Sequence, residues 1–396
     1  MTHLSSQPTN IQRLAIVTET WPPDINGVAN TLNQLYQVLV QRMEVDLVRP
    51  RPRHPSGPLA GLQVRGFPLP GYPELQFGMV SARKLIRHWL SRRPDAVYVA
   101  TQGPLGWSAI KAARRLAIPV ASGFHTNFHA YSSHYGVGFM EALIRLYLRH
   151  FHNQTRVTLA PTPDIQAQVT ALGVRDVRVW GRGVDAQRFN PALRSAELRR
   201  QWGLTAHDLA VIYVGRLAAE KNLEQVVSSY ARIRAQVPTA RLVLVGDGPC
   251  RKRLQRRHPE FIYAGMQQGR ALAEHYASGD LFLFPSETET FGNVVLEAMA
   301  SGLAVVAYDR AAARIHIENG RSGITVPPGD EQAFSAAALQ LATRPSLLTR
   351  LKRAAREHAQ HQSWPRMADV FLEVISLAIR NEAHHANATP SASRSA

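Results

Sequence analysis

The sequence predicts an α/β protein of two domains, each built on a parallel sheet that helices cover on both faces. The first observation is length, since 396 residues at roughly 150 per domain suggest two or three domains. The second is that short, continuous apolar runs alternate with helical patterns, as in strands buried on both faces of a sheet. The third is that this alternation stops in a turn-rich segment at 181–191 and then begins again.

The apolar runs have the length of strands, and the patterns between them have the length of helices. The strands expected in the first domain are 14–19, 44–48, 95–100, 118–122, 157–160 and 177–180, and its helices are 28–40, 79–91, 104–117 and 139–151. The strands expected in the second domain are 209–215, 241–246, 281–286 and 304–309, and its helices are 222–235, 250–257 and 291–300. An amphipathic helix is expected at 364–380.

These elements set the expected boundaries. We place the first domain at 13–190, the second at 191–362 and a last helix at 363–381, between disordered tails at 1–12 and 382–396. The single cysteine, Cys250, excludes an internal disulfide framework and a multi-thiolate metal cluster. No apolar signal segment and no run near ~18 apolar residues is visible. We therefore expect a cytoplasmic protein without a spanning helix.

Positive charge is in large excess, because 46 Lys and Arg face 29 Asp and Glu, a net charge of +17. Such an excess attracts nucleic acid, an anionic membrane surface or phosphorylated ligands, although an ordinary solvated surface would also explain it. No nucleic-acid-binding motif is visible, so we expect no nucleic-acid partner. Two segments are basic and amphipathic, SARKLIRHWLSRR at 81–93 and FMEALIRLYLRHF at 139–151. Their helices could lie in a membrane interface or simply pack on the sheet.

Ligands of open α/β sheets bind outside the carboxyl ends of the strands, so reactive or ligand-binding residues are expected in the loops after strands. Gly27 precedes the first helix, where a small residue lets ligand oxygens approach the backbone amides, although many such loops contain glycine. His125 directly follows an expected strand in GFHTNFHAY, where its ring would face the site. A structural histidine bonded to a backbone carbonyl is the alternative.

Two further loops belong to the second domain. Arg216 and Lys221 flank a strand-to-helix corner, where two cations could clamp a diphosphate or remain solvated charges. Glu289 precedes a helix and Glu297 lies inside its apolar stretch VVLEAMA, where a carboxylate is costly unless it binds something such as sugar hydroxyls. Glu287 competes for the outer position. The amides expected to face a phosphate are those of Phe291, Gly292 and Asn293.

Other motifs are incomplete. GDGPCR begins like a dinucleotide fingerprint, but Arg251 stands where the third glycine belongs, which disfavours a nicotinamide oxidoreductase. There is no phosphate loop of the GxxxxGK[ST] type and no HExxH zinc motif. The sequence also lacks an Asp-x-Asp pair, so we expect no metal and no cofactor. Arg216 and Lys221 would then neutralise the leaving group.

The order of motifs resembles the family 4 retaining glycosyltransferases of the GT-B fold over 13–380. The segments that carry the resemblance are GRLAAEKN, LVGDGP, YASGDLFLFPS and ETFGNVVLEAMASG, starting at 215, 244, 276 and 289. WPPDINGV, GFHTNFHAYSSHYG and WGRGVDAQRFNP resemble one branch, which includes α-mannosyltransferases and the transferases that make glycosylated or sulfoquinovosyl diacylglycerols. The resemblance implies two Rossmann-like domains facing across a cleft, with the last helix returning to the first domain.

The resemblance also implies a role for each matching residue. Glu289 would contact the donor sugar and Glu297 the nucleotide ribose. Arg216 and Lys221 would bind the diphosphate, and Gly27 would lie near donor phosphate and acceptor. His125 would line the sugar site, and Arg182 could reach the cleft. Two positions depart from the family pattern, Ala304 in place of a frequent Pro, and Asn26 before Gly27 in place of a Gly-Gly pair.

The implied reaction is transfer of a hexose with retention of configuration, without metal, from a nucleotide-diphospho-sugar to an acceptor. GDP-mannose is the favoured donor, because WGRGVD resembles mannosyltransferases. A UDP-sugar-dependent glucosyl, glucuronosyl or sulfoquinovosyl transferase remains an alternative, as does a GT-B epimerase or phosphorylase. The expected acceptor is a glycolipid or diacylglycerol-type lipid. We accordingly expect a peripheral enzyme on the anionic cytoplasmic face of the inner membrane.

Overall fold

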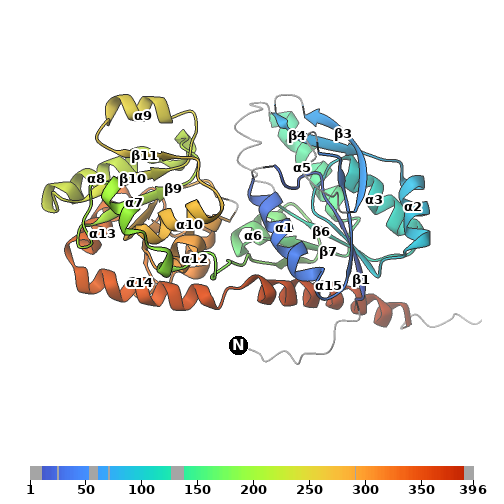
Figure 1. The fold of residues 1–396 in the computed structure, drawn as a ribbon. Coiled ribbons are helices and arrows are strands. Elements are labelled where there is room, and N and C mark those ends of the chain that lie inside the picture. The colour runs from blue at the N-terminus through green and yellow to red at the C-terminus, as the bar shows by residue number, and fades with distance from the viewer. Residues whose placement is uncertain are drawn as a thin grey trace, which may run out of the picture. The chain divides into compact units, whose positions relative to one another are not determined.

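The chain folds into two compact units, each with its own sheet and core. A computed structural model describes residues 11–24, 26–52, 61–69, 72–125, 138–289 and 291–387 (Figure 1). Unit 1 comprises Met1–Gly181 and Trp364–Ala396, and unit 2 comprises Arg182–Ser363.

Unit 1 is built on an eight-stranded sheet of order β4-β3-β2-β1-β5-β6-β7-β8. Every strand pair is parallel except the edge pair of β3 and β4. The strands are β1 Arg13–Val17, β2 Glu44–Pro50, β3 Leu62–Leu69, β4 Tyr72–Met79, β5 Ala96–Val99, β6 Val120–Gly123, β7 Val157–Ala160 and β8 Val177–Val179. The helices are α1 Gly27–Leu39, α2 Ala82–Ser91, α3 Pro104–Arg115, α5 Gly138–His152, α6 Pro163–Ala171 and α15 Trp364–Asn387.

Alternation along β1 explains why both faces of this sheet are covered. Leu14 and Ile16 belong to a core that includes residues of α1 and Phe371 of α15. Ala15 and Val17 point the other way, into a core with residues of α2 and α3. Successive side chains of a strand face opposite sides, so a continuous apolar run can bury both faces.

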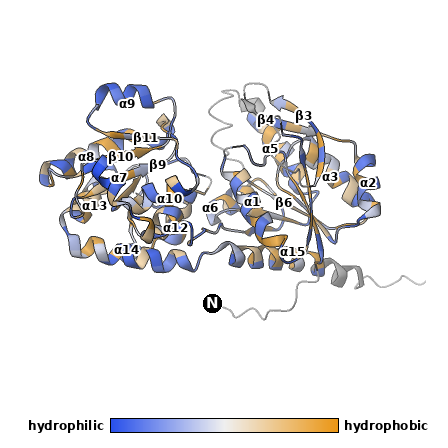
Figure 2. Cartoon of the chain, in the orientation of Figure 1, coloured by the Kyte–Doolittle hydropathy of each residue, from blue (hydrophilic) through white to orange (hydrophobic). Residues whose placement is uncertain are grey.

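Unit 2 repeats this plan with a six-stranded, wholly parallel sheet of order β11-β10-β9-β12-β13-β14. Its strands are β9 Ala210–Val214, β10 Arg241–Val245, β11 Ile262–Gly265, β12 Leu281–Phe284, β13 Ala304–Tyr308 and β14 Ile324–Val326. Its helices are α7 Ala196–Gln201, α8 Leu223–Gln236, α9 Arg251–Arg257, α10 Gly269–Ser278, α11 Asn293–Ala300, α12 Ala311–His316, α13 Glu331–Thr343 and α14 Pro345–Gln360. Figure 2 shows apolar strands beside the largely hydrophilic α9.

All the expected strands and helices exist, with shifted ends, but several elements were missed. Expected helix 79–91 begins only at Ala82, because residues up to Met79 belong to β4. The sequence analysis did not predict β3, β4, β11, β14, α6, α7, α10, α12, α13 or α14.

The expected boundaries need correction at three places. The expected border at 190/191 falls inside unit 2, since Val184 bridges to Ser363 and Phe189 is in the unit 2 core. Of the expected N-terminal tail, Ile11 is buried and the Gln12 amide donates to Asp95. Residues 382–387 of the expected C-terminal tail continue α15, since extending an existing helix is far easier than starting one.

The two basic amphipathic segments turn out to be different. In α2, Leu85 and Trp89 are fully buried against the sheet, and the Trp89 indole donates to Asp46 at 3.0 Å. The apolar face of α2 is therefore part of the core. In α5, by contrast, Leu143 and Leu146 are 45% and 60% exposed. No helix among the described residues has the length and apolar character needed to cross a membrane.

Candidate active site

Glycines bring two strand-end loops of unit 2 into close contact. A Cβ on Gly246 would lie 2.0 Å from the Gly215 carbonyl oxygen, and one on Gly248 would lie 2.5 Å from that of Leu217. The Leu217 amide donates to the Asp247 carbonyl at 2.9 Å. The glycines of GDGP thus allow the loop after β10 to pack on the loop that carries Arg216.

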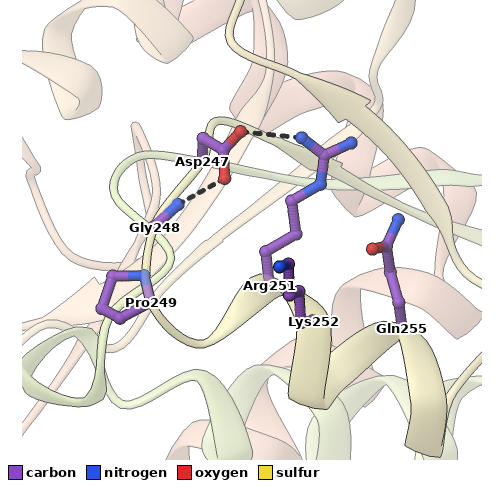
Figure 3. A pocket seen from close by; sticks show the side chains of 6 residues that line it. All are labelled: Asp247, Gly248, Pro249, Arg251, Lys252 and Gln255. Carbon is purple, nitrogen blue, oxygen red and sulfur yellow. Dashed lines mark hydrogen bonds and ion pairs between the residues drawn. The ribbon is translucent and has the colours of Figure 1, made fainter.

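A pocket of about 360 Å³ lies beside the loop after β10 (Figure 3). Its lining residues are Asp247, Gly248, Pro249, Arg251, Lys252 and Gln255. Arg251 donates to the Asp247 carboxylate at 2.7 Å, and so does the Gly248 amide. Arg251, which breaks the dinucleotide fingerprint, therefore ties down the loop. None of the site residues expected from the sequence lines this pocket.

Lys221 and Glu289 meet at the carboxyl ends of two neighbouring strands. β9 pairs with β12, so the loops that follow them share one edge of the sheet. Lys221 forms an ion pair with Glu289, and its ammonium also lies 3.5 Å from the Ser286 hydroxyl. Ser286 donates to the same Glu289 oxygen at 2.9 Å. The two charged side chains are only 17% and 16% exposed, so the pair is largely shielded from water.

Arg216 is not part of this cluster. Its side chain is 67% exposed, and its nearest acidic partner is Glu220 at 3.8 Å. Its backbone carbonyl accepts a hydrogen bond from Tyr213 at 3.1 Å. The structure therefore fixes the Arg216 backbone while its guanidinium lies at the surface.

Glu297 lies on the inward side of α11 and is bonded to Tyr276. The Tyr276 hydroxyl donates to the carboxylate at 3.0 Å. Burial raises the pKa of Glu297 above its ordinary value, although the Tyr276 hydrogen bond and the charge of Arg188 oppose the rise. Burial and the nearby carboxylate also raise the pKa of Tyr276 well above its ordinary value, so Tyr276 stays a donor. Glu297 is thus a costly, half-buried carboxylate, and among the described residues its hydrogen-bond donor is Tyr276.

The start of α11 has no side-chain cap. Gly292 at its N-cap has a φ of +86°, a conformation that glycine adopts readily. The Asn293 side-chain oxygen is buried and accepts no hydrogen bond within the described structure. The Arg182 guanidinium carbon lies 5.6 Å from the centre of the buried Phe291 ring. Glu287 is exposed, so Glu289 rather than Glu287 is the carboxylate beside Lys221.

The unit 1 candidates follow β1 and β6. Gly27 is the first residue of α1, and a Cβ there would meet open space. The Asn26 side chain already accepts from the Val28 and Ala29 amides, at 3.1 and 2.9 Å, so two amides expected for a ligand are capped. His125 is 9% exposed, and its Nε2 lies 2.9 Å from the Tyr98 hydroxyl. The rest of GFHTNFHAYSSHYG, from 126, lies outside the described residues.

Three partners of these residues were missed by the sequence analysis, namely Ser286, Tyr276 and Tyr98. The signal for Ser286 and Tyr276 was present, since both lie within YASGDLFLFPS. Tyr98 sits in an ordinary apolar strand, DAVYVA, and only strand pairing reveals that it faces His125. Among the described residues, the unit 2 cluster offers the shielded cation of Lys221, two carboxylates and a helix start without a side-chain cap, which suits an anionic ligand with vicinal hydroxyls.

Comparison with known families agrees with this division of the chain. Residues 25–188 match the family model described as "Glycosyltransferase Family 4". Residues 208–344 match the model described as "Glycosyl transferases group 1".

Two relatives and one solved structure illustrate the similarity. The chain is 34% identical over 369 residues to a GDP-mannose-dependent alpha-mannosyltransferase of Mycobacterium tuberculosis, covering 91% of this chain and 95% of that protein. It is 23% identical over 314 residues to an alpha-monoglucosyldiacylglycerol synthase of Streptococcus pneumoniae, covering 75% and 71%. Sucrose-phosphate synthase of Thermosynechococcus elongatus superposes with a TM-score of 0.70 at 19% identity, covering 96% of this chain and all of that one. The expected GT-B fold class is confirmed.

Proposed function

Because this chain belongs to the family 4 glycosyltransferases of the GT-B fold, we propose that it transfers a hexose, with retention of configuration, from a nucleotide-diphospho-sugar to a lipid acceptor. The observation that carries the proposal is the shielded Lys221–Glu289 pair with Ser286 at the carboxyl ends of β9 and β12. A shielded cation at this edge of a parallel sheet suits the diphosphate of a donor.

Each residue of the unit 2 cluster then has a task. Lys221 neutralises the charge that develops on the leaving diphosphate, helped by Arg216 when its exposed guanidinium turns toward the ligand. Glu289 accepts hydrogen bonds from the donor sugar, and Glu297 accepts them from the ribose. The amides of Phe291, Gly292 and Asn293 face a phosphate. This is catalysis by positioning and charge stabilisation.

The chemical step needs no enzymatic nucleophile. The bond between the sugar C1 and the phosphate oxygen breaks as the acceptor oxygen bonds to C1 on the same face. The acceptor proton passes to the leaving phosphate oxygen, which balances charge and retains configuration. His125 and the Gly27 loop line the sugar and acceptor side. We propose that no metal takes part, since the sequence has no Asp-x-Asp pair to hold one.

GDP-mannose is the proposed donor. The proposal is supported by the 34% identical relative, which is named as GDP-mannose-dependent. A UDP-hexose is the second candidate, because the sequence carries no signature that distinguishes a guanine from a uracil base.

The proposed acceptor is a diacylglycerol-type or glycolipid acceptor, and the proposed location is the cytoplasmic face of the membrane. One relative is named as an alpha-monoglucosyldiacylglycerol synthase. Residues 1–190 carry 21 basic and 10 acidic residues, which favours an anionic surface. We place the membrane contact on α5 rather than α2, since α5 exposes two leucines, Leu143 and Leu146, beside the exposed Arg145 and Arg149. On α2, Leu90 is exposed, but Leu85 and Trp89 are buried in the core.

The first experiment is a transfer assay. GDP-mannose and UDP-glucose are each incubated with the protein and anionic vesicles that contain diacylglycerol, with and without EDTA. We expect mannosyl lipid from GDP-mannose, unchanged by EDTA and with the α-configuration of the donor. Donor epimerisation without transfer, or product from UDP-glucose alone, would contradict the proposal.

The second experiment compares two exposed leucines on the two basic helices. Leu146→Ser on α5 is expected to weaken cosedimentation with anionic vesicles, whereas Leu90→Ser, which replaces a residue 66% exposed on α2, is expected to have little effect. Binding is expected to fall with salt and to vanish with zwitterionic lipid. Equal loss in both variants, or no binding by the wild type, would overturn the assignment to α5.

A further inference from the structure

Strand register places a buried tyrosine beside the histidine of unit 1. β5 pairs with β6 so that Tyr98 lies opposite Ala121. Because side chains alternate along a strand, Ala121 and Gly123 share the face of Tyr98, and His125 lies two residues further on. The Tyr98 hydroxyl reaches His125 Nε2 at 2.9 Å.

Close neighbours confine the Tyr98–His125 pair. Tyr98 is fully buried, with edge contacts to the rings of Phe371 on α15 at 5.0 Å and Trp180 at 6.3 Å. The Trp180 ring also lies 6.4 Å from the His125 ring. A Cβ on Gly123 would be 2.2 Å from the Tyr98 hydroxyl and 2.6 Å from His125 Nε2, so even a methyl group there would displace the pair.

We propose that Tyr98 is a positioning residue, whose hydrogen bond to Nε2 fixes the ring of His125 and through that ring supports hexose transfer. This inference rests on the proposed function. An imidazole ring can rotate about the Cβ–Cγ bond. A hydrogen bond to one ring nitrogen determines which edge of the ring faces the ligand. A sugar-contacting group loses rate steeply when it is displaced by even a fraction of an ångström, so a fixed ring favours the reaction.

Tyr98→Phe removes only the hydroxyl and keeps the ring contacts. We expect kcat for GDP-mannose to fall about tenfold, with little change in KM, since the donor nucleotide binds elsewhere. Tyr230→Phe is the matched control, because Tyr230 is equally buried in unit 2 and its hydroxyl donates to a backbone carbonyl at 2.9 Å. The control is expected to keep its kcat whatever its loss of stability.

A double-mutant cycle separates positioning from general stability. In a His125→Ala background, Tyr98→Phe is expected to cause no further loss of kcat, because its effect runs through the missing ring. The same tenfold loss in both backgrounds would overturn the proposal.

A spectroscopic arm keeps the inference testable without turnover. With ¹⁵N-labelled histidine, the Nε2 resonance of His125, assigned by its absence in His125→Ala, is expected to shift in Tyr98→Phe and not in Tyr230→Phe. An unmoved resonance would overturn the pair itself. If the wild type were inactive with GDP-mannose but the resonance still shifted in Tyr98→Phe, the proposed function would be overturned and the Tyr98–His125 pair retained.

Discussion

Two charged clusters lie at opposite ends of the unit 2 sheet and are balanced differently. At the amino end of β12, Asp280 accepts hydrogen bonds from Arg194, Arg199 and Lys352, each at 3.0 Å. Burial raises the pKa of Asp280, but the charges of Lys352 and Arg194 and the hydrogen bond from the Ala210 amide outweigh burial and leave the pKa below its ordinary value. At the carboxyl end, Lys221 is the cation paired with Glu289, and Glu297 keeps a raised pKa.

The two clusters therefore have different roles. At the amino end the protein supplies more positive charge than the carboxylate needs, so the charges stabilise the fold. At the carboxyl end, half-buried carboxylates have few donors among the described residues, an arrangement that costs stability and suits the hydroxyls of the proposed ligand. Substitutions at the two ends should therefore have opposite consequences for stability and for function.

The largest expected effect is on stability at the amino end. Asp280→Ala leaves two Arg and one Lys without their buried partner, and we expect a loss of about 3–5 kcal/mol in the free energy of unfolding. Glu224→Ala is the control, because its ion pairs with Arg253 and Arg257 are more than half exposed and worth at most about 1 kcal/mol. Urea unfolding measures both. If the urea midpoint of Asp280→Ala were no lower than that of Glu224→Ala, the stabilising role of the Asp280 cluster would be refuted.

The next effect is on turnover at the carboxyl end. Lys221→Ala removes the counterion of the leaving diphosphate, and we expect kcat to fall by about 10²–10³-fold. The melting temperature is expected to fall less than in Asp280→Ala, because Glu289 keeps the hydrogen bond from Ser286, whereas Asp280→Ala deprives three cations of their partner. Steady-state GDP release from GDP-mannose measures the turnover. A variant that kept kcat within about threefold of the wild type would remove Lys221 from the mechanism.

Glu297→Gln should show the two consequences in one variant. The amide oxygen can still accept from Tyr276, while the buried charge disappears, so we expect a higher melting temperature in the free protein. Lost charge-assisted bonds to the ribose should weaken GDP binding by about 10–100-fold. Calorimetry measures the GDP affinity, and thermal unfolding measures the melting temperature. Unchanged GDP affinity would refute the ribose contact, and a lower melting temperature would refute the cost of the buried charge.

A smaller effect is expected from pH. Because the pKa of Glu297 is raised, its ionised form is lost at a higher pH than in an ordinary glutamate. GDP binding should therefore weaken as pH falls, beginning at a higher pH than the protonation of an ordinary glutamate would give, beyond the change caused by phosphate protonation. Glu297→Gln reports the phosphate contribution alone. Parallel pH profiles for the wild type and the variant would count against a titrating Glu297.

How much the sequence predicted depended on whether a feature was local. Buried parallel strands such as β9 and β13 can be predicted because they are continuous apolar runs. The edge pair β3 and β4 does not, since LQVRGFPL and YPELQFGM mix polar residues, Gly and Pro in a manner typical of edge strands. The short β11 and β14 carry too few apolar residues for a periodic signal.

The candidate site divides in the same way. Lys221, Glu289 and Glu297 could be selected from the sequence, because charged residues at the ends of apolar strands or inside an apolar helix are unusual. Their partners depend on pairing across long stretches of chain. Lys221 and Glu289 are 68 residues apart, and Tyr98 meets His125 through the register of β5 and β6. The exposure of the Arg216 side chain could not be predicted from the neighbouring sequence either.

Our central proposal is that Lys221, in the loop after β9, binds the diphosphate of the donor nucleotide. The most direct test is calorimetry of GDP and GMP with the wild type and with Lys221→Ala. We predict that the wild type prefers GDP to GMP by at least about tenfold and that Lys221→Ala loses most of this preference. An equal preference for GDP over GMP in both proteins would contradict the claim.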